Sequence, residues 1–442
     1  MNPELLRNLW LEATPQRLVL VPAVLFSAAA LVDVLDPTGL AVARMALFGF
    51  VLLTLVWGAR QAANSVLDEA RDRTWDVQRM CALPAWPMTW GKLAGTTVLA
   101  WYGGACCLLV YAGSGGFAQG RAAWLTLAFA TCAAIIAQSG ALLAALVGMH
   151  RGRAVQARLG NLLVVALLIW VMPKVTSVSA DGDAVRWFGL TFAQLPFAAA
   201  SAACFAAWAL LGASRAMATE LQILNRPTAW LGFLFFSALF LTGFLTNSTS
   251  PSTALLADVC SALALVAGVA AYAALFAYPS DALKLRRVVQ AWRRGDTGRL
   301  QEELPLWVIA AALATLAALA AALLGATPTL GLLHVEQSGL SLVALAGMML
   351  RDLLLLTWLV MVSRPGQAEG LGAVYLVLLD GLLPALLPHL GLGALATLLR
   401  PNALSAPFMA IALYGLQALA AAVLCWHTYG RIHARLSETP AG

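Results

Sequence analysis

The chain has 442 residues, of which 61% are hydrophobic and only 11% are charged. A typical soluble protein is about 45–50% apolar and about 25% charged, and a soluble fold could not keep this much apolar surface from water. The composition excludes a soluble enzyme, a disordered chain and a disulfide-stapled secreted domain, and it predicts an all-α polytopic membrane protein. Loop charges of a membrane protein explain the net charge of +6, so we expect no nucleic-acid partner.

Residues 1–17 precede the first apolar run and mix charged with apolar side chains. Glu4, Arg7 and Glu12 are interleaved with leucines and Trp10, which is typical of a short amphipathic helix in the cytoplasmic interface of a membrane. The alternative is an ordinary charged flank. Acidic residues and a tryptophan before any apolar run argue against a cleavable signal peptide.

Twelve apolar runs follow, each read as a span of roughly 20 residues. They form two sets of six: 18–35, 42–61, 93–113, 122–148, 160–174 and 194–213, then 228–246, 254–278, 305–325, 340–362, 370–390 and 406–428. The fifth run is short, and Pro173 with the polar stretch after it predicts a broken helix or a surface loop. We therefore predict two six-helix halves, residues 1–218 and residues 219–442.

The basic residues predict the orientation of these spans. With the N-terminus inside, 21 of the 27 Lys and Arg residues lie in cytoplasmic segments. The outer segments hold five, and one more, Arg351, falls within a span. Because cytoplasmic loops carry the excess of Lys and Arg, we expect both termini to be cytoplasmic.

The loop after the second span, residues 60–95, is the first candidate for function. A charged turn runs into Trp75, and Pro84 and a Gly91-Lys92 pair follow it. Because proline cannot continue a helix, the loop must form a helix, a bend and a new entry into the membrane. The alternative is that Glu69 to Asp76 are a solvated helix end. The candidate residues of this loop are Glu69, Arg71, Asp72, Arg73, Thr74, Trp75, Pro84, Gly91 and Lys92.

Glu69, Arg73-Thr74, Pro84 and Gly91-Lys92 form a pattern that resembles the coupling helix of type-two ABC exporter permeases, Glu…Gly-Thr…Pro…Gly-Lys between spans two and three. The resemblance implies that residues 1–218 form a six-span permease domain with an N-terminal elbow helix and a coupling helix at about 66–90. The chain departs from the family where Arg73 replaces glycine and where the spacings around the proline differ slightly, as in a divergent subfamily.

The loop after the eighth span, residues 280–305, occupies the equivalent place in the second half. It lacks the motif and instead carries a basic run with a tryptophan: Arg286, Arg287, Trp292, Arg293 and Arg294. Because type-two exporters pair two six-span domains, the resemblance implies a fused, asymmetric pair with a degenerate coupling loop at about 280–304. Alternatively, this run only follows the positive-inside rule or contacts anionic lipid.

Charged residues also occur within two spans. Arg351 and Asp352 lie near the centre of the tenth span and Asp380 near the centre of the eleventh. Ionisable groups in a membrane are costly and usually paired, and neighbours on a helix do not face each other. We therefore expect Arg351 to pair with Asp380, either to fix the helices or to line a translocation route.

Several motifs are missing from the sequence. It contains no GxxxxGK[ST] phosphate-binding loop, so the chain is not expected to be an enzyme or to hold a cofactor. The resemblance implies a separate ABC ATPase, two copies of it, that binds ATP and Mg²⁺. Six of the seven cysteines lie in apolar runs, no CxxC pair occurs, and His334, Glu336 and His389 lack metal-site spacing, so we expect no metal.

We therefore predict a transport permease of the bacterial inner membrane, an exporter subunit whose substrate is lipid-like or amphipathic. Membrane lipid and further permease or periplasmic subunits are its other expected partners. An ion-coupled secondary transporter is the main alternative, because such proteins are also built from repeats. A non-transporting scaffold is the other alternative, and a membrane-embedded transferase or protease is least supported.

Overall fold

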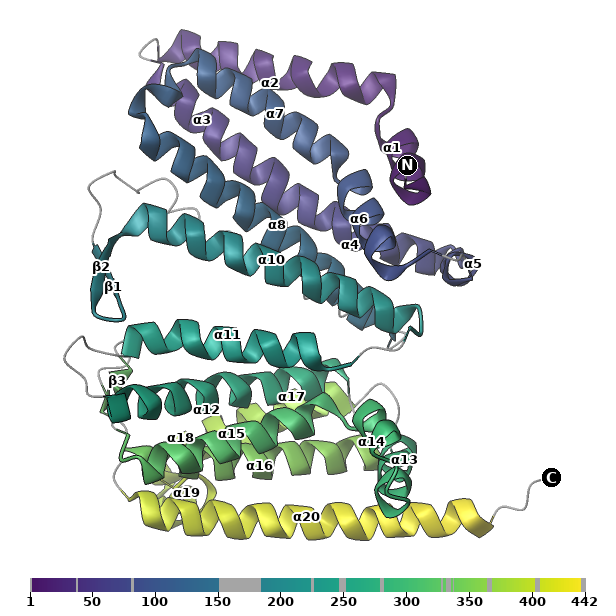
Figure 1. Ribbon diagram of the computed structural model, residues 1–442, viewed down its shortest axis with the longest axis vertical. Coiled ribbons are helices and arrows are strands. Elements are labelled where there is room, and N and C mark those ends of the chain that lie inside the picture. Colours follow the sequence, from purple (N-terminus) through teal and green to yellow (C-terminus); the bar gives the residue numbers. More distant parts are fainter. Residues whose placement is uncertain are drawn as a thin grey trace. The chain divides into compact units, whose positions relative to one another are not determined.

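A computed structural model of the chain describes residues 2–36, 39–80, 83–150, 184–223, 226–245, 252–278, 282–326, 329–330, 335–336, 338–363, 368–401 and 406–438. It is almost entirely helical and divides into two compact units (Figure 1). The first comprises residues 1–185 and 191–225, and the second residues 186–190 and 226–442. This division lies close to the predicted boundary after residue 218.

Ten described helices are long and apolar enough to cross a membrane, or eleven if one bent pair counts as a span. They agree with an integral membrane protein of the all-α class. The bent pair consists of α6 (Ala85–Thr96) and α7 (Val98–Gly113), which meet at 51°. The predicted span at 160–174 lies outside the described residues, so the full twelve-helix layout stays a prediction.

The other elements of the first unit follow in chain order. They are α1 (Pro3–Glu12), α2 (Pro15–Leu35), α3 (Leu40–Val51), the π-helical turn η1 (Leu52–Trp57), α4 (Gly58–Arg71), α5 (Trp75–Arg79), the 3-10 turn η2 (Gly116–Gln119), α8 (Arg121–His150) and α10 (Gln194–Glu220). The short strands β1 (Ala184–Trp187) and β2 (Leu190–Ala193) pair with each other, and their residues are divided between the two units.

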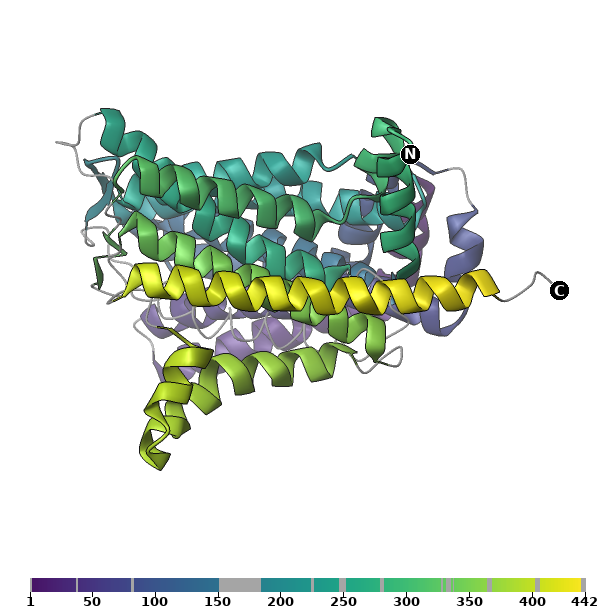
Figure 2. The ribbon, with the colours of Figure 1, turned by 90° about the horizontal axis from the view of Figure 1, so that it is seen from below.

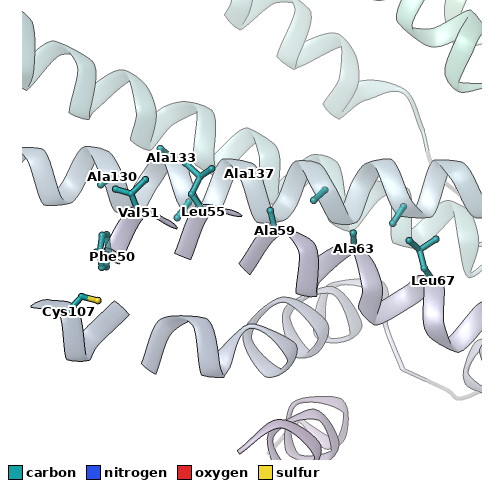
Figure 3. Packing of buried hydrophobic residues seen from close by; sticks show 13 residues of the cluster. Phe50, Val51, Leu55, Ala59, Ala63, Leu67, Cys107, Ala130, Ala133 and Ala137 are labelled. Atoms are coloured by element: carbon teal, nitrogen blue, oxygen red, sulfur yellow. The ribbon is translucent and has the colours of Figure 1, made fainter. Parts of the chain in front are cut away.

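Small residues let the helices of the first unit approach closely, as in many membrane bundles. Ala59 and Ala63 of α4 pack against the alanines of α8, including Ala133 and Ala137 (Figure 3). Gln138 of α8 donates its side-chain N–H to the backbone oxygen of Thr54 at 2.7 Å. A carbonyl in the irregular π-turn is thereby satisfied inside the apolar core, where water cannot replace the bond.

The second unit contains the remaining helices and a second small strand pair. The elements are α11 (Thr228–Leu245), α12 (Ser252–Ala277), α13 (Ala282–Arg293), α14 (Thr297–Glu303), α15 (Leu306–Leu323), β3 (Thr329–Leu330), β4 (Val335–Glu336), α16 (Gly339–Val362), α17 (Ala368–Leu376), the π-turn η3 (Val377–Leu382), α18 (Leu383–Leu386), the 3-10 turn η4 (Leu387–Leu390), α19 (Gly393–Leu399) and α20 (Pro407–Glu438).

The core of the second unit is built on α15, whose alanines pack against α12 and α16. Gly339 begins α16 where it meets α15: a Cβ there would lie 2.5 Å from Cα of Ala322. Figure 2 shows that α17 and the segment after it diverge from the other helices of this unit.

Candidate functional site

The candidate site lies where the second span continues past the membrane. The continuous helical segment Leu40–Arg71 has 32 residues, which corresponds to about 48 Å at 1.5 Å per residue. A hydrocarbon core is about 30 Å thick. The last turns of α4 therefore project beyond it and carry the candidate residues with them.

A tight turn ends α4 and positions Thr74. The Thr74 amide donates to the Glu69 carbonyl at 3.0 Å and the Arg73 amide to the Ala70 carbonyl at 3.4 Å, which is the hydrogen-bond pattern of a Schellman cap. Arg73 has φ = 57°, in the left-handed region that glycine adopts most readily at this position. This geometry gives a physical reason for a Gly-Thr pair here in the permease pattern.

After this turn, α5 forms a single short helix with two contrasting faces. Trp75 is buried, whereas Val77 and Met80 are 63% and 80% exposed. Residues 81–82 lie outside the described part, and the chain enters α6 after Pro84, its N-cap residue. The predicted coupling segment at 66–90 is thus the end of α4, the helix α5 and the start of α6.

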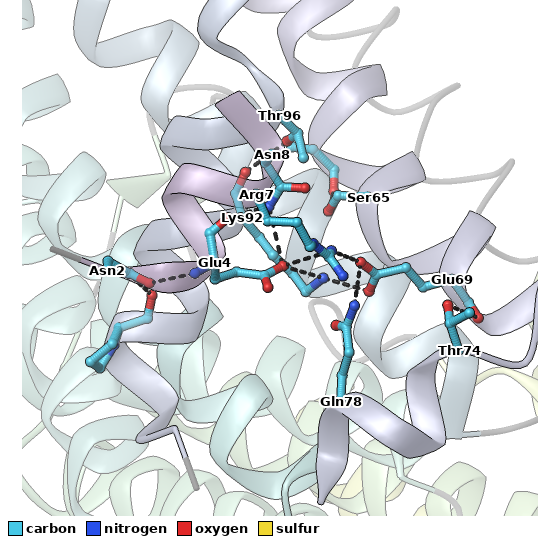
Figure 4. A network of polar contacts seen from close by, with 12 residues as sticks. Asn2, Glu4, Arg7, Asn8, Ser65, Glu69, Thr74, Gln78, Lys92 and Thr96 are labelled. Carbon is cyan, nitrogen blue, oxygen red and sulfur yellow. Dashed lines mark hydrogen bonds and ion pairs between the residues drawn. The ribbon is translucent and has the colours of Figure 1, made fainter. Parts of the chain in front are cut away.

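Lys92 is the centre of a buried polar network (Figure 4). Its side chain is fully buried, and its Nζ lies 2.5 Å from Oε2 of Glu69 and 3.1 Å from Oε1 of Glu4. The ammonium also lies 5.4 Å from the ring centroid of Trp75, within the range of a cation–π interaction. Two carboxylates and an aromatic face therefore replace the hydration of this cation.

The second carboxylate comes from α1, a helix that the sequence did not assign to this site. Arg7 pairs with both Glu4 and Glu69, and Gln78 of α5 donates to Glu69 at 2.8 Å. Two acids and two bases make the network neutral. It joins α1, α4, α5 and α6.

Two glycines allow α1 to reach α6. A Cβ on Gly91 would lie 2.8 Å from Cβ of Glu4, and a Cβ on Gly95 would lie 2.6 Å from Cβ of Asn8. Gly91 is thus required for the close approach that brings Glu4 to Lys92. Glu4 and Asn8 are buried while Trp10 is exposed, so the polar face of α1 points into the protein. This inverted amphipathic pattern is the signal in the sequence that could have placed Glu4 in the site.

Four predicted residues of this loop have side chains outside the network. Arg71, Asp72, Arg73 and Pro84 are exposed, and Arg71 forms an ion pair with Asp68 at 2.9 Å. Pairs of this kind are worth little, about 0–1 kcal/mol.

The equivalent loop of the second unit is organised differently. Its helices α13 and α14 are joined by a turn with Gly295 at φ = 67°, and Arg287 forms an ion pair with Glu303 at 3.3 Å. Trp292, Arg293 and Arg294 are exposed. No buried ion network is found among the described residues of this loop.

A second buried polar centre lies within the apolar helices of the second unit. Arg351 and Asp352 of α16 are almost fully buried. The guanidinium pairs with Asp380 of η3 and with Asp352 at 2.6 Å, and it donates to Gln417 at 3.0 Å. Tyr272 donates to Asp352 at 2.6 Å. The structure thus brings Arg351 and Asp380 together, and Asp352, Tyr272 and Gln417 join them.

Metal ligation has no candidate in the described part of the chain, where no group of three or more His, Cys, Asp or Glu side chains could hold an ion. His334 lies outside the described residues. No protein-family model, curated protein sequence or solved structure matches the chain. The resemblance to permeases therefore depends on the residues described above.

Proposed function

We propose that this chain is the transmembrane permease subunit of an ABC exporter of the bacterial inner membrane, driven by a separate ATPase. Two copies of that ATPase would bind ATP and Mg²⁺ and contact the cytoplasmic loops of both halves. One observation carries the proposal: Glu69, Thr74 and Gly91-Lys92 match the permease pattern in sequence and have connected structural roles around one buried cation. Arg73 departs from the pattern in residue type but adopts the left-handed backbone that a glycine would favour there.

The network could transmit force from a partner to the spans. The exposed side chains of Val77 and Met80 offer α5 as a contact surface for a groove on a soluble protein. Glu69 and Lys92 join the end of α4 to α6, so a push on α5 would move both helices. The link to α1 through Glu4 adds the N-terminal helix, the proposed elbow, to the moving body.

The proposed substrate class is inferred from the small number of ionisable groups in the spans. Ionisable groups are scarce in the described spans, apart from the centre around Arg351. Long apolar surfaces with one polar centre would suit a lipid-like or amphipathic molecule.

The proposal is tested by purifying the tagged full chain from its native membrane and asking whether an ATPase accompanies it. We expect an ATPase to co-purify with the wild-type chain and to be lost with Val77→Ser/Met80→Ser. The matched control is Ile223→Ser, an exposed apolar residue outside both coupling loops, which should retain it. Absence of any ATPase, together with transport driven by an ion gradient alone, would refute the proposal.

The second candidate is an ion-coupled secondary transporter, and the Arg351 centre favours it. Two carboxylates share one guanidinium inside the membrane, as in many ion and proton pathways. Proteoliposomes separate the two candidates, since a secondary transporter needs a gradient and no ATPase. A scaffold would transport under neither condition.

A further inference from the structure

The buried guanidinium of Arg351 binds two points of the chain that are far apart in sequence. Its Nη2 pairs with the carboxylate of Asp380, and its Nη1 donates to the backbone oxygen of Leu399 at 3.0 Å. The residues between these two points must leave Arg351 and return to it. Residues 381–400 therefore form a closed hairpin with both ends at one side chain.

Helix lengths place the two ends of this hairpin deep in the apolar layer. Arg351 lies twelve residues after the first residue of α16, which is about 18 Å along the helix. Gln417 lies ten residues into α20, about 15 Å along, and it donates to the Leu398 oxygen at 2.6 Å. The end of α19 thus lies well below the starts of both long helices.

The hairpin itself is too broken and too short to cross a membrane. It contains α18, η4 and α19, of four, four and seven residues. Figure 2 shows it diverging from the other helices of the unit. Its exposed large hydrophobic side chains are all leucines: Leu382, Leu383, Leu386, Leu390, Leu392, Leu395 and Leu398. His389 and Arg400 are exposed beside them.

The polar contacts at the base of the hairpin satisfy backbone groups that the membrane could not. The last carbonyls of a helix have no partner within it, and an unpaired carbonyl in hydrocarbon is costly. Arg351 and Gln417 bind those of Leu399 and Leu398 at the end of α19. Arg400 donates to the Asp380 carbonyl at 2.8 Å, beside the π-turn.

We infer that residues 381–400 form a re-entrant arm in one leaflet and that Arg351 is the positioning residue that latches it to α16 and α20. The arm turns at Gly391, where φ = 75°, and pivots at the π-turn η3. While it is latched, Arg351 stays buried. Release of the arm exposes the Arg351 side chain and its bound carboxylates laterally to the lipid of that leaflet. This inference holds whether ATP or an ion gradient drives the protein.

Cysteine accessibility in proteoliposomes tests the latch. Gly391→Cys at the turn and Thr397→Cys near the base are introduced separately into the full chain with its native cysteines replaced by alanine. A membrane-impermeant maleimide is then added on one side at a time. We expect Gly391→Cys to react from a single side and Thr397→Cys to react much more slowly.

Adding Gln417→Leu removes one anchor and leaves the buried ions in place. We expect it to raise the labelling rate of Thr397→Cys on the order of tenfold, because the arm loses the hydrogen bond to its Leu398 carbonyl. The substitution also removes the bond from Arg351 to Gln417, but Arg351 keeps its bonds to Asp352, Asp380 and the Leu399 carbonyl. Arg351→Met should raise it further. The matched control is Trp358→Phe, which removes another described α16–α20 side-chain bond, from Trp358 to Thr428 at 3.1 Å, and should change nothing.

Two results would overturn the inference. Equal labelling of Gly391→Cys and Thr397→Cys in the latched chain would show that the arm is not re-entrant. Unchanged labelling of Thr397→Cys with Gln417→Leu would show that these contacts do not hold the arm, and this variant decides the question even if Arg351→Met fails to fold.

Discussion

The substitution Lys92→Met tests most directly whether the predicted coupling segment depends on a buried cation. Methionine retains the length and apolar stem of the side chain but leaves Glu4 and Glu69, both largely buried, with Arg7 as their remaining base. Removing one partner of a buried ion pair costs about 3–5 kcal/mol. For a unit of about 220 residues, this corresponds to a melting temperature lower by about 6–20 °C.

The assay is thermal unfolding of the purified full chain in lipid nanodiscs, followed by intrinsic tryptophan fluorescence. Arg17→Gln is the control, because it breaks the more exposed pair between Arg17 and Glu12 at 2.7 Å and should cost less than about 1 kcal/mol. Lys92→Met/Glu69→Gln should recover part of the loss, since it removes the excess negative charge and leaves Glu4 paired with Arg7. Equal melting temperatures of the Lys92→Met and Arg17→Gln chains would refute the reasoning.

Three further predictions use the same melting assay. Gly91→Ala should destabilise the chain by about 1–3 kcal/mol by pushing α1 from α6, whereas Gly140→Ala, with open space at its Cβ, should be neutral or slightly stabilising; equal effects would contradict the close approach. Arg73→Gly should stabilise by up to about 1 kcal/mol, because glycine relieves the left-handed conformation, and a loss of stability would contradict the assigned cap. Asp380→Asn should lower stability by about 1–3 kcal/mol through a weakened bond to Arg351; normal melting with lost transport would instead favour a polar translocation route.

Much of the fold follows from apolar periodicity. All predicted spans that fall in the described residues coincide with helices, because about 20 apolar residues without strong breakers have no other stable form in a bilayer. The sequence did not predict where these helices deviate from regular, straight α-helices. The bend between α6 and α7 at 51° and the π-turns η1 and η3 depend on local packing, and the apolar pattern is the same with or without them.

The candidate site was only partly readable from the sequence. The motif located Glu69, Thr74 and Lys92, but it gave no reason to connect them to α1. Glu4 joins the network because Gly91 permits helix contact across nearly ninety residues of chain, which is a tertiary effect. The pairing of Arg351 with Asp380 could be predicted because both residues lie near the centres of their spans. The bond from Arg351 to the Leu399 carbonyl could not, because it depends on a hairpin whose hydropathy does not differ from that of a span.

The two units place their buried ions at different positions, and this difference bears on how the protein works. In the first unit Lys92 and its acids lie where α6 meets the end of α4, on the cytoplasmic side in the predicted orientation, while the buried polar residues in the middle of α8, Gln138 and Ser139, are neutral. In the second unit the loop of the equivalent place, residues 280–305, holds no such network among its described residues, and the ions lie in the middle of α16. A pair of identical halves would receive force and contact substrate equally.

Here we expect substitutions at Lys92 to uncouple transport from its energy source and substitutions at Asp380 to affect transport itself. Measuring energy consumption and transport in the same proteoliposomes separates these effects, and parallel losses at both positions would contradict this division of roles.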